Sequence, residues 1–134
     1  MLFQKKAKVI LDTNFLLIPG MFKIDIFTEI NSMVNVPHEI WIVAQTSAEL
    51  EKIITGKGKK DEILAAKLAL VFIKQQSLKI ARSSKRESAD DAILDLARKD
   101  DFVATQDKEL KKKLNSKGVK IIVLRQKTHL SIEN

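Results

Sequence analysis

The sequence predicts an α/β fold, a three-layer α/β/α sandwich built on a central parallel sheet, and three observations support this prediction. Short apolar runs rich in β-branched residues alternate along the chain with longer segments of helical period. Strands that alternate with helices pair in parallel through right-handed crossovers. Acidic residues follow three of the apolar runs, at the sheet edge where open α/β folds place their ligands.

The first part of the chain predicts two strands and an interrupted helix. Lys8–Leu11 is an apolar run of strand length, and a helical pattern follows over Phe15–Ile30. Pro19-Gly20 interrupts this helix early, because proline lacks a backbone donor and glycine is a poor helix former. After Pro37, the run Ile40–Val43 predicts the second strand.

The rest of the chain predicts seven further elements. They are, in order, helices Ser47–Ile54 and Asp61–Gln76 around a GKGKK turn, strand Leu78–Ala81, helix Ser88–Lys99, strand Phe102–Ala104, helix Lys108–Ser116 and strand Val119–Leu124. No internal repeat, low-complexity segment or linker is apparent, so we expect one domain over residues 1–134.

The composition indicates a globular protein with a basic surface. The chain is 45% hydrophobic and 31% charged, and it contains no cysteine, which excludes disulfides and thiolate chemistry. A net charge of +7 favours a polyanionic partner such as nucleic acid, although many lysines also serve solubility. MLFQKKAKVILD lacks the apolar core of a secretory signal, and Leu64–Ile73 is shorter than a membrane span of about 20 residues. We therefore expect a cytoplasmic protein with no membrane partner.

Five acidic residues are the candidate functional groups. Asp12, Glu49 and Asp107 follow strands, and Asp90 and Asp91 open a helix. Taken singly, each has a structural explanation. The sequences TSAE, ending at Glu49, and SADD, ending at Asp91, match the capping box, and Asp12 and Asp107 precede helices that they can cap.

Taken together, the acids predict a metal site. In a parallel sheet they meet at one edge, where carboxylates repel one another unless a cation or a proton neutralises them. Mg²⁺ and Mn²⁺ prefer such hard oxygen ligands. One or two such ions can activate water for attack on a phosphodiester and stabilise the leaving oxygen.

Four segments resemble the acidic motifs of the PIN-domain ribonuclease family. They are LDTN around Asp12, AEL around Glu49, SADDAILDLA around Asp91 and VATQDKEL around Asp107. The segments follow the family's order, and the resemblance covers the chain from about Lys8 to Leu124. It implies a PIN-like fold.

The resemblance also implies roles for individual residues. The catalytic, metal-binding carboxylates would be Asp12, Glu49, Asp91 and Asp107, with Asp90 as a further metal or water-shell ligand. Asn14 would orient Asp12 or a water, and Thr105 would support the site through its hydroxyl. The implied cofactor is Mg²⁺ or Mn²⁺.

The implied activity is metal-dependent endoribonuclease cleavage of single-stranded or looped RNA, because a phosphate in a flexible strand reaches an acidic site more easily than one in a duplex. ATQDKEL and the closing VLRQKTHLSIEN are similar to PIN nucleases of small-subunit ribosomal RNA processing, which favours a ribosome-assembly partner. Two alternatives stay open. One is the toxin of a toxin–antitoxin pair, with an antitoxin partner and a homodimer; the other is a catalytically silent RNA-binding or assembly module.

Overall fold

The computed structural model describes residues 5–133, which form thirteen helices and strands. In chain order these are β1 (Ala7–Leu11), α1 (Thr13–Leu16), α2 (Ile18–Phe22), α3 (Ile26–Met33), β2 (His38–Val43), α4 (Ala44–Thr55), α5 (Lys60–Gln75), β3 (Lys79–Ala81), α6 (Ala89–Leu96), β4 (Phe102–Ala104), α7 (Lys108–Ser116), β5 (Lys120–Arg125) and β6 (His129–Glu133). Residues 1–4, where the MLFQKK segment begins, lie outside the described range.

The strands form one sheet in the order β3-β2-β1-β4-β5-β6. The first five are parallel, and β6 is antiparallel to β5. The register pairs Leu11 with Ala104 on the adjacent strands β1 and β4. The residues that follow them, Asp12 and Thr105, therefore leave the sheet side by side at its carboxyl edge.

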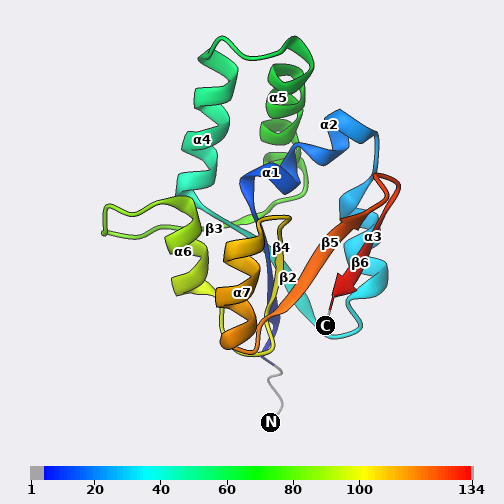
Figure 1. Cartoon of the computed structure of the whole chain (residues 1–134), viewed down its shortest axis with the longest axis vertical. Helices are drawn as coiled ribbons and strands as arrows, with labels where there is room; N and C mark the ends of the chain where they lie inside the picture. The colour runs from blue at the N-terminus through cyan, green and yellow to red at the C-terminus, as the bar shows by residue number, and fades with distance from the viewer. Residues whose placement is uncertain (1–4, 134) are drawn as a thin grey trace.

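Helices cover both faces of this sheet, which confirms the three-layer prediction (Figure 1). Val9 and Leu11 of β1 join a core with helices α1 to α5, whereas Ile10 joins a second core with α6 and α7. This split follows from the alternation of side chains along a strand. In Figure 1, α1, the start of α4 and the first turns of α6 and α7 gather around the upper ends of β1 and β4.

The helical segment after β1 differs from the prediction. It is three helices, and Pro19 and Gly20 lie inside α2 rather than at a break. The chain turns instead at Leu17 and at Lys23, whose φ of 57° is left-handed. Proline is tolerated in the first turn of α2 because no helical acceptor is available there for its missing N–H. The Asp25 carboxylate then caps α3 by accepting from the Thr28 backbone N–H.

Gly20 is required by the contact between α2 and α5. A Cβ at this position would lie 2.6 Å from the Ala65 Cα, which is backbone and cannot rotate away. We expect Gly20→Ala to lower the free energy of unfolding by about 1–3 kcal/mol through overpacking. Gly58→Ala is the matched control, because its Cβ would meet no atom within 4 Å. Equal urea midpoints for the two variants would contradict this close packing.

One strand, β6, escaped the sequence prediction. The turn before it places Gln126 and Lys127 at positive φ, 53° and 57°, where glycine or asparagine is the usual signal of a hairpin. The alternation of Leu130 and Ile132 with polar residues was the remaining indication of a strand. Within residues 5–133, no helix has the length and apolarity to cross a membrane.

Candidate active site

Asp12 is the most buried of the candidate acids, with 6% of its surface exposed. It ends β1 and caps α1, where one carboxylate oxygen accepts from the Thr13 backbone N–H at 2.8 Å. The other oxygen accepts from the Thr105 hydroxyl at 2.8 Å. Burial raises the pKa of Asp12 above 3.8; the Thr105 hydrogen bond lowers it, and the charge of Asp90 raises it further.

Thr105 connects two of the acids from a fully buried position. Its hydroxyl donates to Asp12 and accepts from the backbone N–H of Asp107 at 3.1 Å. Asp107 caps α7, accepting from the backbone N–H groups of Glu109 and Leu110, as its place before that helix predicts. One carboxylate oxygen of Asp107 makes both of these bonds.

Glu49 approaches from α4 and is held by threonines. The Thr13 hydroxyl donates to the Glu49 carboxylate, and the Thr13 and Thr46 hydroxyl oxygens lie 3.2 Å apart. The capping box predicted for Thr46 and Glu49 is wrong, because α4 begins earlier, at Ala44. Sequence reasoning did not single out Thr13 or Thr46, and their signal was a buried hydroxyl beside the first and second acids.

Asp90 and Asp91 lie in the first turn of α6, and both are exposed. Ser88 caps this helix by accepting from the Asp91 backbone N–H at 3.1 Å, which is one half of the predicted capping box. Partial loss of hydration raises the pKa of Asp90 above 3.8, and the charges of Asp107, Glu49 and Asp91 raise it further, while Lys113 lowers it.

These couplings bring together Asp12, Glu49, Asp90, Asp91 and Asp107, which we call the acidic cluster. They come from the ends of β1 and β4 and from α4, α6 and α7 (Figure 1). Asn14 lies exposed on α1, next to the cluster in sequence, while both hydrogen bonds to the Asp12 carboxylate come from Thr13 and Thr105.

The donor chemistry of the acidic cluster suits a hard divalent cation. The raised pKa values of Asp12 and Asp90 show that the carboxylates repel one another, and a cation relieves this repulsion. Among residues 5–133, no three acidic or histidine side chains stand close enough together to enclose an ion by themselves. Water would complete the coordination, as is usual for Mg²⁺, which binds proteins through one or two carboxylates.

Comparison with known proteins agrees with this arrangement. Residues 9–127 match the family described as PIN like domain. Ribonuclease VapC4 of Methanocaldococcus jannaschii is 38% identical over 128 residues, which cover 93% of this chain and 95% of that protein.

Two solved structures share the fold. The PIN domain endonuclease Utp24 superposes with a TM-score of 0.75 at 27% identity, covering 94% of this chain and 90% of that chain. A domain of a functionally unknown protein from Methanocaldococcus jannaschii DSM 2661 has a TM-score of 0.56 at 16% identity, covering 89% and 91% of the two chains, and shows the fold alone. With its motifs in order, its sheet topology and these matches, the chain belongs to the PIN-like domain family.

Proposed function

We propose that this protein is a metal-dependent endoribonuclease that hydrolyses RNA phosphodiester bonds at the acidic cluster. The observation that carries the proposal is the convergence of acids from separate segments around buried Asp12, with Thr105 joining Asp12 to Asp107. Family membership adds support, since one relative is named a ribonuclease and another a PIN domain endonuclease. The domain of residues 1–134 would be the whole catalytic unit.

In this proposal the chain's own groups divide the work. Asp12, Glu49, Asp91 and Asp107 would hold Mg²⁺ or Mn²⁺, and Asp90 would share in binding the ion or its waters. When bound, such an ion activates water and stabilises the leaving oxygen. Thr105 and Thr13 fix the orientation of Asp12 and Glu49. Asn14, exposed beside Asp12, would orient a water or the RNA.

The RNA substrate follows from charge. A chain of net charge +7 attracts phosphates in general, whereas the acidic cluster repels them unless a cation is present. We therefore propose that binding is salt-sensitive and largely independent of sequence, and that single-stranded or looped RNA is the preferred form.

The experiment is cleavage of end-labelled single-stranded and hairpin RNA in Mg²⁺, Mn²⁺ or EDTA. We expect internal cuts with either metal, none in EDTA, and cuts confined to the loop or single strand of the hairpin. Cleavage that proceeds equally in EDTA would contradict the metal-dependent mechanism. A folded parent that binds RNA but never cuts it would favour the silent RNA-binding module instead.

For the physiological role we propose ribosomal RNA processing, on the similarity of ATQDKEL and the closing segment to that group of PIN nucleases. A toxin role is the alternative. Induced expression in a bacterial host separates them, because a toxin arrests growth without its antitoxin and a processing enzyme leaves growth unaffected. Growth arrest that requires Asp12 would overturn the ribosomal assignment while keeping the nuclease.

A further inference from the structure

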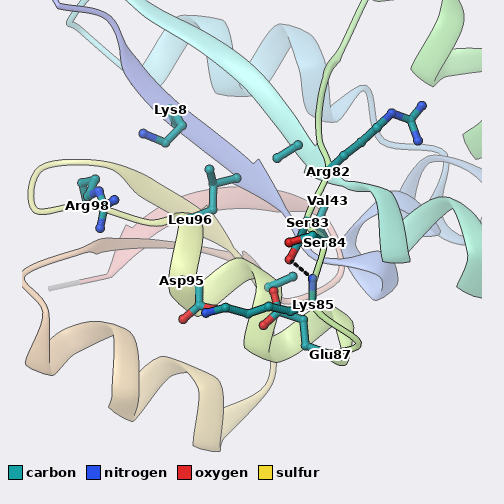
Figure 2. Close-up of a pocket in the computed structure, with 12 residues that line it drawn as sticks. Lys8, Val43, Arg82, Ser83, Ser84, Lys85, Glu87, Asp95, Leu96 and Arg98 are labelled. Atoms are coloured by element: carbon teal, nitrogen blue, oxygen red, sulfur yellow. Dashed lines mark hydrogen bonds and ion pairs between the residues drawn. The ribbon is translucent and has the colours of Figure 1, made fainter.

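A second feature lies next to the acidic cluster, a pocket of about 450 Å³ against α6 (Figure 2). The sheet forms its floor, with Lys8 of β1, Val43 of β2 and Ala81 at the end of β3. The last turn of α6 forms one wall through Asp95 and Leu96. The loop from Arg82 to Glu87, between β3 and α6, forms the other wall, and we call this space the α6 pocket.

Cationic side chains stand at both ends of the α6 pocket. Lys85 reaches across to Asp95 at one end, and Arg98 and Lys8 lie at the other (Figure 2). Lys8 is committed to Asp101, 3.1 Å away and only 7% exposed. The Lys85–Asp95 pair is long, 3.8 Å, and exposed, so it contributes little and can be exchanged. Lys85 and Arg98 are therefore available to an anion.

The α6 pocket and the acidic cluster share one helix. Asp91, in the first turn of α6, precedes Asp95 by four residues, which is about 6 Å along the helix axis. The loop that enters α6 is ordered by a hydrogen bond from the Lys85 backbone N–H to the Ser83 hydroxyl, at 3.1 Å. A strand with one phosphate at the acidic cluster therefore has a direct path along α6 into the pocket.

We propose that the α6 pocket binds an unpaired nucleotide of the RNA adjacent to the scissile phosphate, with Lys85 and Arg98 contacting its flanking phosphates. This inference rests on the proposed ribonuclease function. The volume falls within the range of about 300–1,000 Å³ typical of small-ligand pockets. Val43, Ala81 and Leu96 offer apolar surface for a base, and serine hydroxyls in the loop are common donors to phosphates. A paired base cannot enter, so the pocket selects single-stranded RNA.

The test is RNA binding by Lys85→Ala/Arg98→Ala in an Asp12→Asn background, which prevents cleavage during the measurement. We expect the dissociation constant of a fluorescein-labelled unstructured RNA to rise about tenfold, the size of one charge-assisted contact. The slope of log affinity against log salt should fall by about 1.4, or 0.7 for each lost contact to a single strand. Fluorescence anisotropy across a salt series measures both.

Lys67→Ala/Lys74→Ala is the matched control, because it removes the same two charges from the exposed side of α5. We expect a clearly smaller change in affinity and salt slope. Equal effects of the two double variants would overturn the α6 pocket and leave the nuclease standing, since only general charge would matter. Absence of RNA binding by Asp12→Asn alone would overturn the proposed function as well.

Crosslinking locates the bound nucleotide independently of charge. An RNA with one 4-thiouridine, stepped outward from the cleavage position, is irradiated with the Asp12→Asn protein and the crosslinked peptide is sequenced. We expect crosslinks to residues 82–98 from positions on one side of the cleaved bond, within its nearest neighbours. Crosslinks confined to other segments would contradict the proposal even if the lysine and arginine variants bind weakly.

Discussion

Asp12→Asn is expected to reduce RNA cleavage about a thousandfold or more, because losing one anionic ligand removes several kcal/mol of transition-state stabilisation. The variant should fold normally. Asparagine still accepts from the Thr13 N–H, and its amide can donate to the Thr105 hydroxyl oxygen in the place of the present bond. RNA affinity without metal should be unchanged or higher, because a negative charge that repels phosphate is gone. Quenched-flow cleavage and anisotropy measure the two effects.

The same variant should respond differently to metal. Mn²⁺ bound to the folded parent raises its melting temperature by mass action, and Asp12→Asn should lose most of this shift. Asp100→Asn is the matched control, since Asp100 is an exposed acid before β4 whose positive φ, 73°, asparagine tolerates well. If Asp12→Asn keeps the parent's Mn²⁺-induced shift, Asp12 is not a metal ligand.

The raised pKa of Asp12 also predicts how stability depends on pH in EDTA. The folded chain takes up this proton at a higher pH than the unfolded chain, whose carboxyl has the ordinary pKa near 3.8. The Asp12 contribution to the free energy of unfolding therefore grows as the pH falls through the raised pKa, and it is complete below 3.8. Asp25 has a lowered pKa and acts in the opposite sense, so the parent-minus-Asp12→Asn difference is the quantity to follow by urea titration. A difference that is independent of pH would contradict the assignment.

Thr105→Val is the second change of large expected effect. Valine keeps the shape of this fully buried residue but removes the donor to Asp12 and the acceptor of the Asp107 N–H. We expect a loss of about 1–3 kcal/mol of stability from the unpaired groups. The pKa of Asp12 should rise further, because the Thr105 hydrogen bond lowers it.

Catalysis by Thr105→Val should then require about 10–100 times more Mn²⁺ for half-maximal rate, the usual cost of losing a partner that orients a metal ligand. Thr105→Ser restores the hydroxyl and is the control, and we expect it to recover most of the Mn²⁺ affinity. Equal half-saturating Mn²⁺ for the valine variant and the parent would show that Thr105 does not position Asp12.

The sequence predicted the sheet edge because parallel β/α units force it. Asp12, Thr105 and Asp107 follow strands that are neighbours in the sheet, and short buried strands such as Phe102–Ala104 have a clear apolar signal. Resemblance to the PIN family then grouped the acids, and the family match confirms that resemblance. The start of α4 was misplaced because two threonines that resemble caps are inside or before helices for a different purpose, the contact with Glu49.

Features that depend on tertiary contact were beyond sequence reasoning. Gly20 appears as a helix breaker, yet its role is the close approach to Ala65. The hairpin to β6 uses Gln126 and Lys127 at positive φ without the usual glycine, and the neighbouring strand supplies the stabilising pairs. The α6 pocket unites β1, β2, β3 and α6, so no single segment contains its signal.

The central claim is that the acidic cluster holds a divalent cation that RNA cleavage requires. The most direct test treats parent and Asp12→Asn with EDTA, returns Mn²⁺ in steps, and follows cleavage of one end-labelled single-stranded RNA. The account predicts no cleavage in EDTA, saturable recovery by the parent, and no recovery by the variant over the same range. Cleavage by Asp12→Asn at the parent's rate, or by the parent in EDTA, would contradict it.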